Sequence, residues 1–181
     1  MEEHVPAAKP VAILIGSRSD LEMGQQCARE LAHLGVSSEM HIVSAHRTPD
    51  ELDHLVAHLD AQGVEVYIAA AGLSAALPGA VAARTLRPVI GLPLASGPLS
   101  GWDALLSVAQ MPPGVPVATV GVGAARNAAL LAVRIMARIA HASGDDRLLD
   151  RLYEHREAMA HQVRDDEDVL QEQLRQGGGS H

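Results

Sequence analysis

The chain has 181 residues, long enough to bury the core of one domain without disulfides or a structural metal. Its formal charge of -8 gives no support for a nucleic-acid-binding surface, and a single cysteine excludes an internal disulfide and a cysteine-based zinc site. The apolar runs are short and the first ten residues are polar, so we expect no signal peptide, no membrane span and a cytoplasmic location.

The hydrophobic core must be built almost without aromatic side chains. Hydrophobic residues make up 48% of the sequence, but the chain has no Phe, one Trp and two Tyr. Ala, Leu, Val and Ile are left to fill the core, which favours close packing of helices on a sheet. Cys27 fits this pattern as a small buried residue on a helix.

Short apolar runs alternate with amphipathic helical patterns along the chain. The predicted strands are residues 11–15, 38–43, 64–70, 88–92 and 115–120. The predicted helices are residues 20–34, a segment that ends near residue 63, and residues 77–85, 102–109 and 127–140. Five strands, each followed by a helix, predict a three-layer αβα domain of the α/β class over residues 10–142, with a five-stranded parallel sheet in the flavodoxin-like order.

The composition changes after residue 142. Residues 143–176 are charged and helical in period, with more apolar positions than a free helix should expose. We expect a long C-terminal helix that docks on a neighbouring subunit, and docking on its own domain is the alternative. The two ends, residues 1–9 and 177–181, are expected to be flexible.

The loop after the second predicted strand carries a histidine and an arginine. Thr48 and Glu51 are spaced as a capping box, which predicts that a helix begins here and leaves His46 and Arg47 on the loop before it. An open parallel sheet binds ligands at this place, just beyond the carboxyl end of a strand. Imidazole can move a proton near neutral pH and guanidinium can grip a phosphate, although a histidine in a loop can also be a solvated surface group.

The loop after the first predicted strand reads GSRSD over residues 16–20. Ser19 and Glu22 have the spacing of a capping box, and a helix start with nearby hydroxyl groups can bind an anion through its backbone N–H groups. Asp20 can either favour the helix dipole or accept hydrogen bonds from ribose hydroxyls. The third and fourth loops, residues 71–79 and 93–101, are rich in Gly, Ser and Ala, which suggests one pocket shared by the loops at this edge of the sheet.

Taken together, these loops and two later segments resemble the PurE family of purine biosynthesis. The matching motifs, which cover about residues 10–140, are GSRSD at 16–20, SAHRTP at 44–49, LPG at 77–79, QMPPGVPVATV at 110–120 and NAALLA at 127–132. The resemblance implies a flavodoxin-like subunit, usually in a homo-octamer, that forms 4-carboxy-5-aminoimidazole ribonucleotide (CAIR) without a metal or organic cofactor. Class I members of the family move a carboxylate from N5 of N5-CAIR to C4, whereas class II members carboxylate aminoimidazole ribonucleotide (AIR) directly with carbon dioxide.

The resemblance also implies roles for individual residues. His46 would be the catalytic proton-transfer residue, because C4 of an aminoimidazole loses a proton after it takes up the carboxyl group. The ribose phosphate would be held by Ser17, Ser19, Asp20, Ser44 and Arg47. The rest of the substrate site would consist of Ala45, Gly72, Leu73, Ser74, Ala76 and Leu77. The small loops would exclude water and hold carbon dioxide against the ring.

The third loop departs from the class I pattern. Class I mutases typically read GGAAHLPG there, whereas this chain reads GLSAALPG over residues 72–79, so Ala76 stands where the second histidine is expected. Class II carboxylases also lack that histidine and carry a serine in the position of Ser74, but the His46-Arg47 pair and residues 110–120 look like class I. We expect direct carboxylation of AIR, with the mutase reaction as the alternative.

Two functions of other kinds stay open. A flavin- or nucleotide-binding module of the same fold would also have polar loops at this edge. It would give no reason for the His46-Arg47 pair, and the loops lack aromatic side chains for stacking apart from Trp102. A non-catalytic homologue that binds the nucleotide without turnover is the other possibility, and no nucleic-acid or membrane partner is expected.

Overall fold

The structure is a computed structural model that describes residues 9–177. The flexible ends expected at residues 1–9 and 177–181 lie outside the described residues, except for Lys9 and Gly177.

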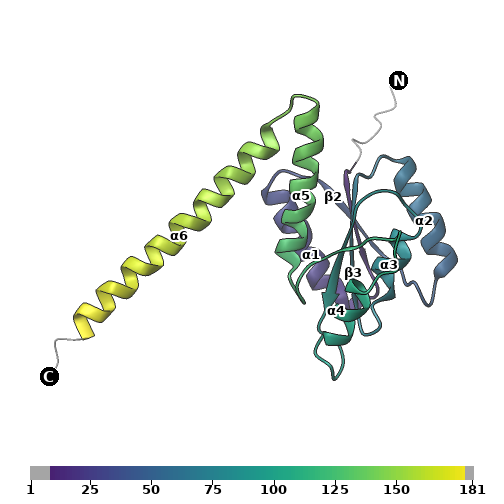
Figure 1. Ribbon diagram of the computed structural model, residues 1–181, viewed down its shortest axis with the longest axis horizontal. Helices are drawn as coiled ribbons and strands as arrows, with labels where there is room; N and C mark the ends of the chain where they lie inside the picture. The colour runs from purple at the N-terminus through teal and green to yellow at the C-terminus, as the bar shows by residue number, and fades with distance from the viewer. Residues whose placement is uncertain (1–8, 178–181) are drawn as a thin grey trace.

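Five parallel strands form one sheet in the order β2-β1-β3-β4-β5. The strands are β1 (Val11–Ile15), β2 (Ser38–Ile42), β3 (Val66–Gly72), β4 (Val89–Leu94) and β5 (Ala118–Thr119). This is the flavodoxin-like order, and the predicted fold is confirmed. Figure 1 shows the sheet with helices packed beside it. The carboxyl ends of the first four strands therefore follow one another along one edge in the order β2, β1, β3, β4.

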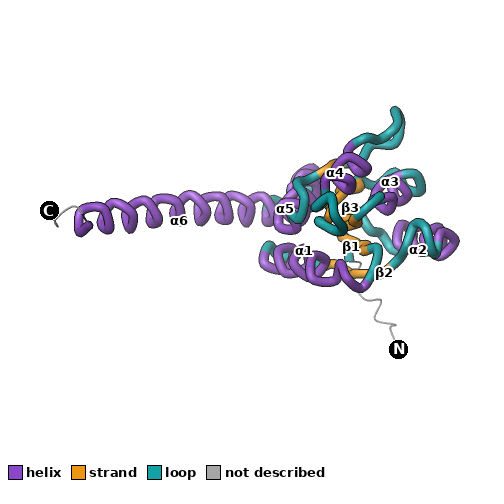
Figure 2. Tube along the Cα trace, turned by 90° about the horizontal axis from the view of Figure 1, so that it is seen from below, coloured by secondary structure: helices purple, strands orange, loops and turns teal. Residues whose placement is uncertain are grey.

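Helices cover both faces of the sheet, which gives the predicted three layers (Figure 2). They are α1 (Leu21–His33), α2 (Pro49–Ala61), α3 (Ala76–Ala82), α4 (Trp102–Ala109) and α5 (Ala125–Ala142), followed by α6 (Arg147–Gly177). Successive residues of β1 point to opposite faces, so Ile13 packs with α1 and α5 whereas Leu14 packs with α2, α3 and α4.

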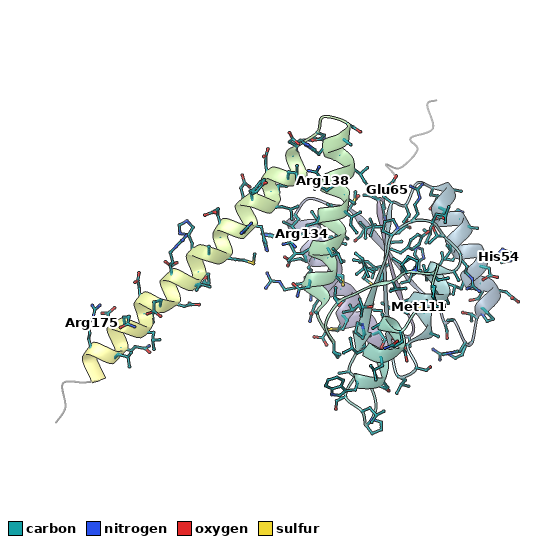
Figure 3. All side chains as sticks on the ribbon, viewed as in Figure 1. His54, Glu65, Met111, Arg134, Arg138 and Arg175 are labelled. Atoms are coloured by element: carbon teal, nitrogen blue, oxygen red, sulfur yellow. The ribbon has the colours of Figure 1, made fainter. Side chains whose placement is uncertain are left out.

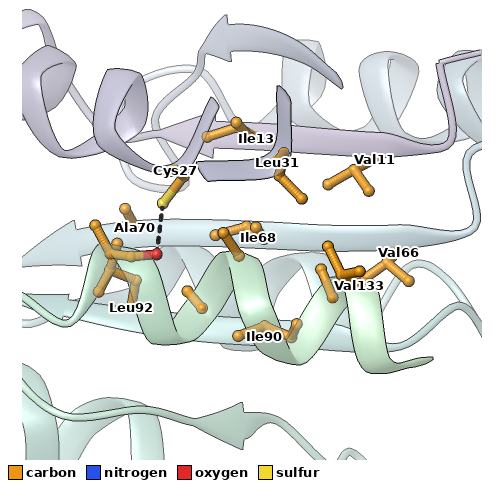
Figure 4. Close-up of a cluster of buried hydrophobic side chains, with 14 of the residues drawn as sticks. Val11, Ile13, Cys27, Leu31, Val66, Ile68, Ala70, Ile90, Leu92 and Val133 are labelled. Carbon is orange, nitrogen blue, oxygen red and sulfur yellow. Dashed lines mark hydrogen bonds between the residues drawn. The ribbon is translucent and has the colours of Figure 1, made fainter. Parts of the chain in front are cut away.

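Small side chains let α1 and α5 approach each other on the first face. Ala128, Ala129 and Ala132 of α5 are fully buried there. Cys27 of α1 is also fully buried, as predicted, and its thiol donates a hydrogen bond to the Ala125 carbonyl at 3.4 Å (Figure 4). Burial raises the pKa of this thiol to about 12, so it stays protonated at neutral pH.

Several predicted boundaries are wrong. The fifth strand is only Ala118–Thr119, not residues 115–120, and Pro116 has no N–H with which to extend the ladder. β3 and β4 begin later than predicted, at Val66 and Val89, and each ends two residues later, where Gly72 pairs with Leu94 at the end of the ladder. The first helix starts later than predicted, since Arg18–Asp20 form a separate 3-10 turn before α1.

The C-terminal helix α6 packs on its own domain only over its first turns. Leu148 and Leu152 contact the core beside α5, and Arg151 Nη1 donates to the Leu34 carbonyl at 3.1 Å. Further along, α6 projects away from the domain (Figures 1 and 2), and all its side chains over residues 161–175 are exposed. Neither α6 nor another helix within residues 9–177 is long and apolar enough to span a membrane.

Candidate active site

A pocket of about 430 Å³ opens at the carboxyl ends of β1, β2, β3 and β4. Its lining includes all the residues that the sequence suggests for the site: Ser17, Ser19, Asp20, Ser44, Ala45, His46, Arg47, Gly72, Leu73, Ser74, Ala76 and Leu77. Gly16, Ala71, Ala75 and Ser96 complete it. The sequence indicated that the fourth loop shares this pocket, but nothing in the sequence singled out Ser96 from its neighbours.

The loop after β1 gathers two hydroxyl groups around one carboxylate. Ser17 Oγ donates to Asp20 Oδ2 at 3.2 Å and Ser19 Oγ donates to Asp20 Oδ1 at 3.0 Å, while the two hydroxyl oxygens lie 2.5 Å apart. The predicted capping box of Ser19 with Glu22 is therefore wrong: Asp20 is the N-cap of α1 and no side chain caps the helix. Asp20 is buried in the pocket wall, where its carboxylate can accept further hydrogen bonds from ligand hydroxyls.

The loop after β2 is closed by Thr48. Its hydroxyl donates to the Ser44 carbonyl at 3.2 Å and accepts from the Ser44 N–H at 3.1 Å. Thr48 is the N-cap of α2 and Pro49 its first residue, as predicted, but the capping box with Glu51 is wrong because the hydroxyl is turned back into the loop. This turn fixes the backbone that carries His46 and Arg47.

Arg47 connects the loops after β2 and β1. Its Nη2 donates to the Gly16 carbonyl at 3.0 Å and its Nε donates to Ser44 Oγ at 3.3 Å. A guanidinium group has five N–H donors, so the exposed Arg47 side chain keeps donors for an anion at the pocket rim. His46 is exposed, lines the same pocket and makes no hydrogen bond within residues 9–177, so its two ring nitrogens are available to a ligand.

The loop after β3 is strained. Leu73 and Ala75 have backbone φ angles of 55° and 34°, in the left-handed region that residues other than glycine rarely adopt. The Ala75 N–H donates to the Gly72 carbonyl at 3.0 Å, and α3 then begins at Ala76. Strain of this kind persists only where surrounding contacts hold it, and it clusters at functional sites.

The third loop gives the pocket a wall of small and apolar side chains. Ala71, Ala75, Ala76 and Leu77 line it, and Ser74 is the polar side chain of this segment. Ala76 faces the pocket at the start of α3, so no imidazole stands at that position. Within residues 9–177 there is also no cluster of three His, Cys, Asp or Glu side chains that could hold a metal ion.

Comparison with known proteins gives the family. The AIR carboxylase family matches residues 10–162, and the chain belongs to this enzyme family. The chain is 51% identical to the N5-carboxyaminoimidazole ribonucleotide mutase of Pyrococcus abyssi, over 70% of this chain and 72% of that protein. It is 41% identical to the mutase of Methanocaldococcus jannaschii, over 91% of this chain and 99% of that protein.

A solved structure agrees with this assignment. The crystal structure of Treponema denticola PurE covers 88% of this chain with a TM-score of 0.78 and 32% sequence identity, and 97% of that chain is matched. The PurE resemblance and the prediction of an enzyme are confirmed, and the chain is an enzyme of purine biosynthesis that forms CAIR. The names of the relatives favour the mutase alternative over the direct carboxylation that the third loop suggested.

Proposed function

We propose that this protein is an N5-CAIR mutase, which moves the carboxylate of N5-CAIR from N5 to C4 to give CAIR. The observation that carries the proposal is that His46 lines the same pocket as the polar cluster of Ser17, Asp20 and Arg47. Curated relatives with 41–51% identity bear the name of this activity.

The polar cluster suits the ribose phosphate. Arg47 contributes a positive charge and further N–H donors, and Ser17, Ser19 and Ser44 contribute hydroxyl groups. Asp20 is an acceptor, and we assign it to the ribose hydroxyls because a carboxylate repels a phosphate. The charged part of the ligand thus lies across the loops after β2 and β1.

His46 has the chemistry for both proton transfers. When the N5–carboxyl bond breaks, its electron pair stays on N5, which takes a proton from the imidazolium and releases carbon dioxide. The C4 carbon then forms a bond to carbon dioxide, and the imidazole takes the C4 proton as the ring becomes aromatic again. The imidazole ends in the state in which it began, and no oxidant or reductant is required.

The small side chains of the third loop form the wall against which carbon dioxide is held. The side chains of Ala71, Ala75 and Ala76 carry no charge and no hydrogen-bonding group, so these side chains bind no water. Carbon dioxide released at N5 then stays close to C4, which makes recombination effectively intramolecular.

Direct carboxylation of AIR is the second candidate, and Ala76 is the observation that favours it. The two reactions are separated by assaying the protein in buffer depleted of carbon dioxide. A mutase converts N5-CAIR to CAIR there at nearly its normal rate. If N5-CAIR reacts no faster than its spontaneous breakdown to AIR, and AIR turnover rises with added carbon dioxide, the protein is a carboxylase.

We infer in addition that the protein assembles with copies of itself, as an octamer if it follows the PurE pattern. Val163, Leu170 and Leu174 form an exposed apolar stripe on α6. The outer part of α6 is acidic at residues 165–168, whereas α5 exposes Arg134 and Arg138 (Figure 3). Opposite charges and apolar surface on the same molecule favour docking of α6 against the helices of a second copy.

A further inference from the structure

Ser96 and Gly72 interlock the third and fourth loops. A Cβ atom on Gly72 would collide with the Ser96 hydroxyl and lie 2.7 Å from Ser96 Cβ, so the Ser96 side chain sits directly over the Gly72 backbone. The third loop in turn packs on the fourth, because a Cβ atom on Gly97 would lie 2.7 Å from Leu73 Cδ2. These two contacts pack the third and fourth loops against each other and place the Ser96 side chain beside the Gly72 backbone.

The order of the strands sets which end of the ligand reaches Ser96. The loop after β2 carries Arg47 and Ser44, and the loop after β1 carries Ser17 and Ser19. The loops after β3 and β4 follow along the same edge. Neighbouring strands are about 4.8 Å apart, so the β4 loop lies on the order of 10 Å from the β1 loop. A ligand whose phosphate is held at the β2–β1 end therefore directs its imidazole and carboxyl group toward β3 and β4.

At that end the pocket offers two polar side chains, Ser74 and Ser96, among residues 71–77 and 96. Neither hydroxyl makes a hydrogen bond within residues 9–177. Ser74 lies on the exposed part of the strained loop, whereas Ser96 is partly buried and packed over Gly72. Ser96 is thus the better preorganised donor on this wall.

We propose that the Ser96 hydroxyl donates a hydrogen bond to the carboxylate of the substrate and so determines specificity for the carboxylated ribonucleotide. This proposal rests on the proposed function of the pocket and extends it. A carboxylate without a polar partner on this small apolar wall would be costly to desolvate. Ser96 supplies that partner in a chain that has Ala76 in place of an imidazole.

The test compares ligands that differ only in the carboxyl group. For wild type, Ser96→Ala, Ser96→Cys and Ser100→Ala, we would measure kcat/KM for N5-CAIR and the dissociation constants of CAIR and AIR. Cysteine has the same shape as serine and keeps a side chain over Gly72, although it is somewhat larger, and its thiol is a weak donor. Ser100 is on the same loop and is not among the residues that line the pocket, so its variant is the matched control.

Ser96→Ala and Ser96→Cys should each lower kcat/KM and the affinity for CAIR by roughly 10- to 100-fold, as for a hydrogen bond to a charged group, with AIR affinity unchanged. Ser100→Ala should behave as wild type. The proposal is overturned if Ser96→Cys retains wild-type values, if CAIR and AIR weaken equally, or if neither changes. If wild type proves to carboxylate AIR instead, the mutase assignment fails, while the CAIR-to-AIR comparison still decides the role of Ser96.

Discussion

At the scale of single residues, the chemistry depends on His46. Replacing His46 with Asn should lower turnover of N5-CAIR by roughly 10²–10⁴-fold, the usual contribution of a positioned acid–base group. The affinity for AIR should stay nearly the same, because His46 is exposed and makes no hydrogen bond within residues 9–177 whose loss could disturb the loop. Steady-state kinetics and a binding titration on the same preparation give both values.

His54→Asn is the matched control for this experiment. His54 is exposed on α2 and points away from the sheet (Figure 3), so its replacement should leave turnover unchanged. Equal turnover by wild type and His46→Asn would remove His46 from the mechanism. A large loss of AIR affinity would instead give it a binding role.

The sequence predicts some single residues better than others. His46 and Arg47 could be found because they lie on the loop after a strand, and that loop lies at the ligand-binding edge of any open parallel sheet. Ser96 could not be distinguished from Ser100, since only the packing of Ser96 over Gly72 decides which of the two lines the pocket. The capping boxes predicted for Ser19 and Thr48 are wrong. Each hydroxyl could form a hydrogen bond either with the N–H groups at the start of its helix or with the adjacent loop, and in the structure each bonds to the loop.

At the scale of elements, apolar periodicity predicts which segments are strands and helices, and chain chemistry limits where they end. β1 and α4 have the predicted bounds because their apolar patterns stop at polar or glycine-rich loops. β5 does not, because residues 115–120 are apolar enough for a strand but include Pro116. The later ends of β3 and β4 follow from pairing between the strands, which no local pattern in either one reveals.

Cys27 is buried where α1 packs on α5, and it should make the free energy of unfolding fall as the pH rises into the alkaline range. Burial raises the pKa of this thiol from 9.0 to about 12. Below pH 9 both folded and unfolded chains keep the proton; between pH 9 and 12 only the unfolded chain loses it. The thiol's contribution to the free energy of unfolding should therefore fall by about 1.4 kcal/mol per pH unit across that window.

Denaturant unfolding of wild type and Cys27→Ala at pH 8 and pH 11 checks this effect. Other groups that titrate at high pH, including the buried Tyr67, are shared by both proteins and cancel in the difference. The stability advantage of wild type should shrink as the pH rises. A difference that stays constant from pH 8 to pH 11 would mean that the thiol titrates alike in both states.

At the scale of the whole molecule, α6 should hold the assembly together. Leu170→Glu puts a charge in the apolar stripe of α6. Because the Leu170 side chain is exposed within one subunit, the subunit should stay folded while the assembly dissociates. Sedimentation should show the octamer for wild type and smaller species for Leu170→Glu. Gln173→Glu adds the same charge at an exposed polar position of α6 and should keep the wild-type mass; an unchanged mass for Leu170→Glu would exclude this stripe from the interface.

In the proposed mechanism, the carboxyl group leaves N5 and reaches C4 without leaving the pocket. The experiment that checks this claim uses N5-CAIR labelled with carbon-13 in its carboxyl group, in the presence of excess unlabelled carbon dioxide. Early in the reaction, CAIR made by this protein should retain most of the label, because carbon dioxide held against the third loop recombines before it exchanges with solvent. CAIR that carries mainly unlabelled carbon, after correction for spontaneous breakdown of N5-CAIR, would contradict the claim and identify the protein as a direct carboxylase.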